Sequence, residues 1–426
     1  MELKQGSIYS IKTADEEHVG VFINETATTI FLKLKSGYNM GIDKKKIKET
    51  KLLEEKKEVK HETKEVKQKP GLPKISILHT GGTVASKVDY STGAVIAQFS
   101  EQDLLNLFPE IHEVANIRSE LVRNMQSEMM RFEHYNILAK AVKKEAENGA
   151  DGIIITHGTD LLHYTSAALS FSLENLGIPV VLVGSQRSSD RPSTDAAINL
   201  LSAVKFIAKT DYSGVAICMH EDTNDSECLI IPGVKAKKFH TSRRDAFKPV
   251  NSKPIAKVNN EKNKIEFISK YDKRDKKKKI ELKLFNEKLK VGLFEPHPNM
   301  YASELLAYKD FDGLVLELLG IGHMPTMKMD EFTAENEKIF SAIKELTKKM
   351  PVVASAQTVY GRINMNVYTP GKQLLEAGVI GNYTDMHPEL AFIKLSWLLS
   401  NYKKEEVKKL YETNLRGEIS ERIEAE

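Results

Sequence analysis

The sequence contains little that could cross-link the chain, anchor it in a membrane or hold a structural metal. Its only two cysteines, Cys218 and Cys228, have neither CxxC spacing nor a nearby pair of histidines. This pattern argues against structural zinc and against a disulfide framework, so we expect reduced, structural thiols and no metal site. No apolar run approaches the ~18 residues that span a bilayer, and the first five residues lack the apolar core of a signal peptide. We therefore expect a cytoplasmic protein without membrane contact.

Charge of one sign is also lacking. The chain has 62 basic and 59 acidic residues, a formal net charge of +3. No strong field therefore commits the whole protein to nucleic acid or to anionic membranes, and any such role must be local. A length of 426 residues with 41% hydrophobic content predicts two or three compact units.

The first part of the chain, residues 1–50, is predicted to be a small all-β barrel. Apolar and polar positions alternate in short runs such as Ser7–Ile11 and Thr29–Leu34. Four aromatic residues could stack on bases, but a small barrel must also fill its own core, which is the interpretation we favour; they are Tyr9, Phe22, Phe31 and Tyr38. Docking of a partner is the function we expect for this unit.

Residues 51–73 are predicted to form a charged linker. The stretch is almost wholly Lys, Glu, Val and Gln, and Pro70-Gly71-Leu72-Pro73 stops any helix that forms. Since both charge signs are interleaved, a solvated connector is favoured over a binding tail.

The rest of the chain is predicted to be α/β, in two parallel-sheet domains at residues 74–272 and 290–405, followed by a helical tail at 406–426. Fully apolar runs such as Ile75–Leu78 and Val180–Val183 alternate with amphipathic segments of helical length. Such runs indicate buried parallel strands with helices on both faces. Lys276–Lys279, near the join, could touch RNA, but we favour a solvated linker.

Two threonine- and glycine-containing loops follow predicted strands of the first domain. Ile75–Leu78 is followed by His79-Thr80-Gly81-Gly82-Thr83, and Ile153–Ile155 by Thr156-His157-Gly158-Thr159-Asp160. Ligands of open parallel sheets collect beyond the carboxyl ends of the strands. Glycine lets a ligand approach backbone N–H groups, which could form an oxyanion hole, and a threonine hydroxyl can act as a nucleophile if a base such as a neutral lysine accepts its proton.

Each feature also has a structural interpretation. A Gly-Gly turn after a strand is often only a turn, and a phosphate cradle is possible, although neither GxGxxG nor GxxxxGK[ST] is present. Asp160 could cap a helix that begins near Leu161. Tyr90 could be an ordinary loop aromatic, and His157 is expected to be structural rather than a base.

Together, the TGGT and HGTD loops resemble the two signatures of the bacterial-type L-asparaginase family. The resemblance extends over roughly Lys74 to Lys404, and includes Tyr90–Gly93, Gln126–Met129, Val183–Arg187 and Leu374–Val379. It implies two parallel-sheet asparaginase-type domains after the small barrel.

The resemblance also implies roles for individual residues. Thr83 would be the primary nucleophile, and Thr159, Asp160 and Lys238 would relay protons. Lys235 and Lys237 compete with Lys238, but the distance to the Phe247-Lys248 step favours Lys238.

Three further residues complete the implied site. Tyr90 would be the flexible-loop tyrosine that assists the nucleophile. Ser127 and Glu128 would hold the α-amino and α-carboxylate ends of the substrate, with Glu128 neutralising the ammonium.

The segments before and within the first α/β domain are similar to the D-subunit family of archaeal glutamyl-tRNA(Gln) amidotransferases. The β-rich domain and linker precede Lys74, and Ser185–Asp195 forms a longer loop than in free asparaginases. This resemblance implies ammonia release from glutamine or asparagine, for a separate E subunit that uses ATP to amidate Glu-tRNA(Gln).

The same resemblance implies the assembly. No cofactor is expected in this chain, ATP and Mg²⁺ would bind the partner, Glu-tRNA(Gln) would be held mainly by the partner, and a homodimer would sit within a heterotetramer. The alternatives are a free-standing L-asparaginase with an extra N-terminal domain and a non-catalytic protein whose barrel recognises RNA.

Overall fold

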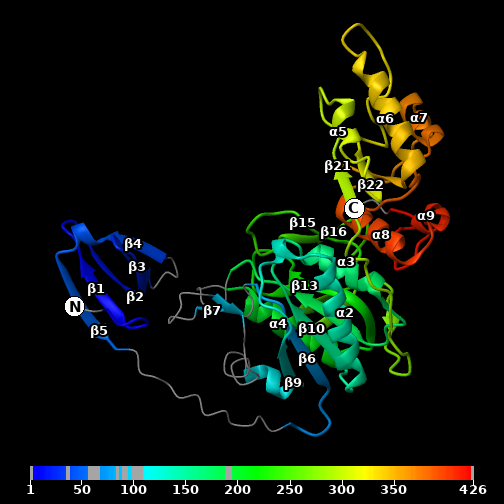
Figure 1. The fold of residues 1–426 in the computed structure, drawn as a ribbon. Coiled ribbons are helices and arrows are strands. Elements are labelled where there is room, and N and C mark those ends of the chain that lie inside the picture. The colour runs from blue at the N-terminus through cyan, green and yellow to red at the C-terminus, as the bar shows by residue number, and fades with distance from the viewer. Residues whose placement is uncertain are drawn as a thin grey trace.

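A computed structural model describes residues 3–34, 39–55, 68–82, 86–88, 95–97, 109–187 and 194–423. Its elements form a small antiparallel β unit and two α/β units (Figure 1). No helix in these ranges is long and apolar enough to cross a membrane. Both cysteines are buried free thiols, on adjacent strands of the first α/β unit.

The small unit is a five-stranded antiparallel sheet with the order β4-β3-β2-β1-β5. Tyr9 and Phe22 lie in its core with nearly perpendicular rings whose centroids are 6.1 Å apart, as the core interpretation of these aromatics requires. Phe31 is half-buried, and Tyr38 lies outside the described residues. The strands are β1 (Ile8–Lys12), β2 (Glu17–Glu25), β3 (Thr29–Leu34), β4 (Asn39–Asp43) and β5 (Glu49–Glu54), with a 3-10 turn at Lys44–Lys46.

The predicted boundary at residue 50 is wrong. Strand β5 continues to Glu54 and pairs with β1, so the first residues of the predicted linker belong to the sheet. The exposed Lys and Glu side chains of β5 made this strand look like part of the linker. An edge strand can carry such charges, because they discourage pairing with other chains.

The first α/β unit is built on a mixed sheet with the order β18-β17-β14-β13-β12-β10-β6-β9. The five strands from β9 to β13 in this order are parallel, as the apolar runs predict, and three antiparallel strands extend the sheet beyond them. The strands are β6 (Lys74–His79), β9 (Asn116–Leu121), β10 (Gly152–Thr156), β12 (Pro179–Val183), β13 (Tyr212–His220), β14 (Glu227–Pro232), β17 (Ala256–Asn259) and β18 (Lys264–Phe267).

Helices cover both faces of this sheet. Ile153 and Ile155 of β10 pack with α2 (Phe132–Glu147) and α3 (Leu162–Ser172), whereas Ile154 packs with α4 (Ala196–Lys209) on the other face. The shorter elements are β7 (Ser86–Val88), β8 (Val95–Ala97), β11 (Leu173–Glu174), β15 (Ala236–Lys238), β16 (Phe247–Pro249), β19 (Asp272–Lys273), β20 (Glu281–Leu282), and 3-10 helices at Pro109–Glu113 and Ser127–Met129.

The second α/β unit has a three-stranded parallel sheet with the order β21-β22-β23. Helix α8 covers the face that meets the first unit, and α5, α6 and α7 pack in a separate core that includes the other face. The elements are β21 (Val291–Phe294), α5 (Ala302–Leu306), β22 (Gly313–Leu318), α6 (Glu335–Lys349), β23 (Val352–Ala356), α7 (Thr369–Ala377), α8 (Pro388–Asn401) and α9 (Lys404–Tyr411).

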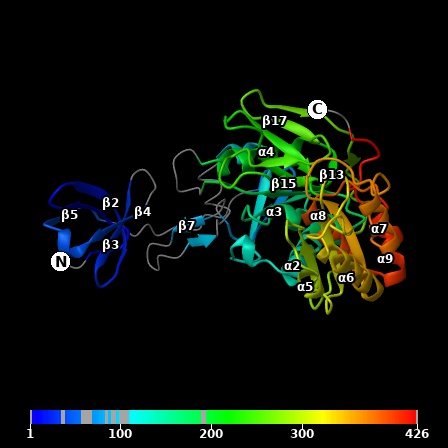
Figure 2. The ribbon, with the colours of Figure 1, turned by 90° about the horizontal axis from the view of Figure 1, so that it is seen from above.

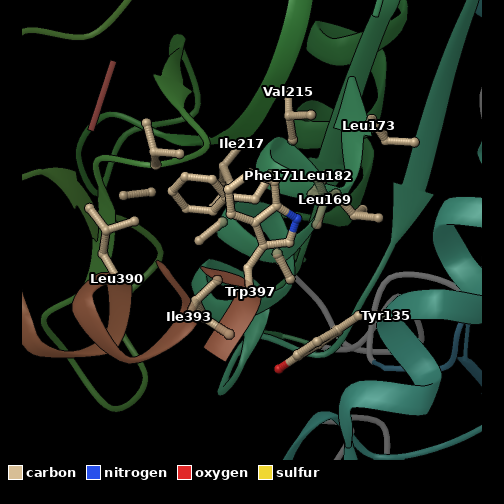
Figure 3. Packing of buried hydrophobic residues seen from close by; sticks show 14 of the residues in the cluster. Tyr135, Leu169, Phe171, Leu173, Leu182, Val215, Ile217, Leu390, Ile393 and Trp397 are labelled. Carbon is tan, nitrogen blue, oxygen red and sulfur yellow. The ribbon is translucent and has the colours of Figure 1, made fainter. Parts of the chain in front are cut away.

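One of the hydrophobic cores extends across both α/β units. Helix α8 lies beside α3 where the units meet (Figure 2), and Trp397 of α8 packs on Phe171 of α3 with ring centroids 5.2 Å apart. Figure 3 shows Trp397, Ile393 and Leu390 of α8 among residues of the first unit. The core between the units therefore fixes α8 relative to the first sheet.

The predicted helical tail is helical only to Tyr411, and residues 412–423 form turns and bends. The carboxylate of Glu418 accepts hydrogen bonds from the backbone N–H groups of Leu415 and Arg416, which competes with helix formation. Glu418 also pairs with Lys394 of α8 at 2.5 Å, and both side chains are fully buried. The residues after Tyr411 are thus held against α8 through Glu418 and do not continue the helix.

This buried pair predicts a large loss of stability on Lys394→Met. The substitution leaves the Glu418 carboxylate buried without its cation, which costs about 3–5 kcal/mol. The control Lys349→Met removes the exposed pair with Glu345 on α6 and is expected to cost less than about 1 kcal/mol. Urea unfolding of both variants measures the difference, and equal losses would contradict the role given to the buried pair.

Candidate active site

The site begins where two neighbouring parallel strands end. Strands β6 and β10 pair in a register that places His79 beside Thr156. Just beyond, the backbone N–H and the hydroxyl of Thr80 both donate to the carbonyl oxygen of Thr156, at 3.1 and 2.9 Å. The two loops singled out from the sequence therefore leave the sheet side by side.

Where the two loops meet, the backbone conformation and the close contacts between chains of atoms leave room only for glycine. Gly81 and Gly82 have φ values of +111° and +81°, which other residues rarely adopt. A Cβ at Gly82 would lie 2.5 Å from the backbone nitrogen of Gly158, and a Cβ at Gly158 would lie 2.8 Å from the Oγ of Ser127. Three loops thus meet at van der Waals distance. Thr83 follows Gly82 in the chain but lies outside the described residues, as does Tyr90.

Lys238, at the end of β15, joins the second loop to a third segment of chain. Its Nζ donates to the Oγ1 of Thr159 and to the Oδ1 of Asp160, both at 2.8 Å. The Lys238 side chain is 11% exposed, whereas that of Asp160 is 64% exposed. The structure therefore brings together three of the residues named from the sequence, and their arrangement suits proton transfer between a hydroxyl and an amine.

The alternative role considered for Asp160 is not what the structure shows. Helix α3 has Leu161 as its N-cap residue and no side-chain capping hydrogen bond. The carboxylate of Asp160 instead accepts from Lys238. Among the three candidate lysines, Lys235 and Lys237 pair with Asp385 and Glu389 of the second unit.

Two buried histidines hold the loops in place. His157 Nδ1 donates to the carbonyl oxygen of Gly158 at 2.7 Å, and its Nε2 accepts from the hydroxyl of Thr165 at 2.9 Å. Burial lowers the pKa of His157 to about 4, so the ring is neutral at pH 7. This agrees with a structural histidine rather than a base.

His79 was missed from the sequence. Its ring nitrogens lie 2.8 and 2.9 Å from the hydroxyl oxygens of Thr156 and Ser119, and burial lowers its pKa to about 4. The available signal was its position as the last residue of an apolar strand, since a polar side chain there must find partners on the neighbouring strands.

The two predicted substrate-binding residues share a 3-10 turn at the same junction. Ser127 is buried, with its Oγ accepting from the backbone N–H of Leu161 at 3.4 Å, and Glu128 is exposed. In the described ranges no group of three or more His, Cys, Asp or Glu side chains is arranged to hold a metal ion.

Comparison with known families divides the chain into three matched segments. Residues 3–53 match the GatD N-terminal domain, residues 74–272 the Asparaginase, N-terminal family, and residues 290–411 the Glutaminase/Asparaginase C-terminal domain. The D subunit of a glutamyl-tRNA(Gln) amidotransferase from Methanococcus maripaludis is 45% identical over 93% of both chains, and that from Pyrococcus abyssi is 44% identical over 92% of this chain and 87% of its own. The chain belongs to the D-subunit family of glutamyl-tRNA(Gln) amidotransferases.

Solved structures confirm the predicted fold class. The thermostable L-asparaginase from Thermococcus kodakarensis superposes with a TM-score of 0.70 and 32% identity over 82% of this chain and all of that one. L-asparaginase I from Vibrio cholerae gives 0.68 and 26% identity, over 82% and 99% of the two chains. The resemblance inferred from the motifs is thereby confirmed, whereas the roles of the individual residues stay predictions.

The low pKa values of the two loop histidines predict a loss of stability in acid. Imidazole in the unfolded chain titrates near 6.5, so between pH 6.5 and 4 the unfolded state binds protons that folded His79 and His157 do not. The free energy of unfolding therefore falls as the pH falls through this window, by at most about 2 kcal/mol per histidine at pH 5. Urea unfolding at pH 7 and pH 5 measures it. His157→Gln is expected to lose less stability than the wild type between these pH values. An equal loss would refute the low pKa given to His157.

Proposed function

We propose that this chain is the ammonia-releasing subunit of a two-subunit amidotransferase, with Thr83 as the nucleophile and glutamine or asparagine as the amide donor. The observation that carries the proposal is the Lys238 Nζ shared between Thr159 and Asp160 at 2.8 Å, beside the loop that leads into Thr83. Membership of the D-subunit family supports the same activity.

The proposed reaction has two halves. In the first, the Thr83 Oγ attacks the carboxamide carbon, its proton passes through Thr159 and Lys238 to the departing nitrogen, and ammonia leaves as the carbon–nitrogen bond breaks. In the second, water attacks the acyl-enzyme, releases the acid and returns a proton to Thr83. Asp160 holds the lysine amine in position, because a charge-assisted hydrogen bond restricts an otherwise mobile side chain.

The remaining parts of the site have supporting roles in this proposal. Ser127 and Glu128 bind the α-amino and α-carboxylate ends of the substrate, and Tyr90 closes over the site and assists Thr83. The tight glycine loops allow backbone N–H groups to approach the carboxamide oxygen, which favours an oxyanion hole there.

The proposed assembly places the other chemistry on a second protein. The chain itself would need neither cofactor nor metal, whereas an E subunit would bind ATP, Mg²⁺ and most of the Glu-tRNA(Gln). A homodimer of this chain would carry two such partners in the cytoplasm. The five-stranded N-terminal unit would dock the partner.

Two substitutions test the relay. Thr83→Ala is expected to lower ammonia release from glutamine to a small residual rate, and Lys238→Met to lower kcat by about 10²–10⁴-fold. Because residues that act as one unit are not additive, Thr83→Ala/Lys238→Met should be no slower than Thr83→Ala alone. Ammonia release by the complex with the E subunit is the measurement, with Lys209→Met at the exposed end of α4 as a control. Wild-type rates in Thr83→Ala would refute the mechanism.

The match to free L-asparaginases over 82% of the chain favours one alternative, an independent asparaginase with an extra domain. Glutamine and asparagine hydrolysis by the isolated chain, with and without the E subunit and Glu-tRNA(Gln), separates the two. We expect slow hydrolysis until partner and tRNA are present. Fast asparagine turnover by the chain alone, unchanged by the partner, would support the alternative.

A further inference from the structure

Two neighbouring lysines of β15, Lys237 and Lys238, contact different α/β units. Successive side chains of a strand point to opposite faces, so Lys237 and Lys238 point apart. Lys238 contacts Thr159 and Asp160 of the first unit, while Lys237 forms an ion pair with Glu389 in the first turn of α8. The strand that carries the predicted catalytic amine is therefore held from behind by the second unit.

Strand β15 has little support of its own. It has only three residues and pairs with a second three-residue strand, β16, in a two-stranded ribbon. Such a ribbon is marginally stable without packing against other elements. The position of Lys238 thus depends on the side chains that fasten the ribbon to the rest of the protein.

Glu389 is well suited to fasten it. The carboxylate is largely buried, with its Oε2 at 2.9 Å from the Nδ1 of His387 and its Oε1 at 4.0 Å from the Nε2 of His163. Burial alone would disfavour the charged form, but the hydrogen bond from His387 and the charge of Lys237 outweigh it and lower the pKa of Glu389. Glu389 is therefore ionised at pH 7. It neutralises the ammonium of Lys237, the residue that directly precedes Lys238.

We propose that Glu389 and Lys237 are positioning residues for Lys238, through which helix α8 of the second unit sets the geometry of the proton relay. The proposal rests on the proposed function of Lys238. Neither residue touches Thr159 or Asp160 in the described contacts; they act through β15. Truncating the pair should therefore impair proton transfer more than substrate binding, because Ser127 and Glu128 lie on a different loop.

Glu389→Gln and Lys237→Met test the proposal, as kcat and KM for glutamine in the complex with the E subunit. We expect kcat to fall about tenfold in each, with KM within about twofold of the wild type. Lys237→Arg, which keeps the charge, should retain most of the activity. Lys237→Met/Glu389→Gln should recover part of the loss of Glu389→Gln, since no unpaired charge remains beside Lys238.

Lys394→Met is the matched control, because it also breaks a buried lysine–glutamate pair of α8 but one that does not touch β15. It should lower the free energy of unfolding while kcat per folded molecule stays within about twofold. Unchanged kcat in Glu389→Gln, or the same fall in kcat for Lys394→Met, would overturn the proposal.

A second variant covers the case in which Glu389→Gln does not fold. Glu389→Asp keeps the charge but withdraws the carboxylate by one methylene, and kcat should fall several-fold at unchanged KM; wild-type kcat in this variant and in Lys237→Met would overturn the proposal. Failure of the proposed function looks different, since Lys238→Met itself would then be fully active.

Discussion

The packing of α8 on α3 is the interaction on which the arrangement of the site depends. Trp397 and Phe171 are both fully buried at this contact, and burial of a large apolar side chain contributes about 1.5–3 kcal/mol. The contact places the N-terminus of α8, with Glu389, against the back of β15. A core shared by two units thus supplies what the short ribbon cannot supply for itself.

Backbone contact governs the other side of the site. The turn at Gly81 and Gly82 reaches the second loop because no Cβ separates it from Gly158, and Gly158 in turn lies against Ser127. Contacts between backbone atoms leave little room for adjustment, since protein interiors are packed as densely as organic crystals. The turn at Gly81 and Gly82, the loop at Gly158 and the turn that carries Ser127 are therefore positioned together.

The sequence predicted these loops better than the segments and ion pairs that hold them in place. Apolar runs located the parallel strands, and the loops after Leu78 and Ile155 were singled out because ligands of open parallel sheets collect beyond the carboxyl ends of the strands. Periodicity could not find β5, whose exposed charged residues resemble a linker. Ion pairs between distant segments were also beyond its reach: Lys235–Asp385 and Lys237–Glu389 join residues 150 and 152 positions apart, and no local pattern specifies such partners. The choice of Lys238 came from resemblance to a family alone, whereas in the structure its partners distinguish it from its two neighbours.

The hydrogen bonds of the two loop histidines, His79 and His157, give them a structural role that differs from the role proposed for Lys238. Both ring nitrogens of His157 are engaged, with Gly158 and Thr165, and those of His79 lie against Thr156 and Ser119. With pKa values of about 4, neither ring changes its charge around pH 7, so the loops keep one set of hydrogen bonds there. In the function that we propose, proton transfer is the role of the Lys238 amine, which lies on β15, outside these loops. On this proposal, the placement of β15 affects proton transfer separately from the turn that carries Ser127 and Glu128.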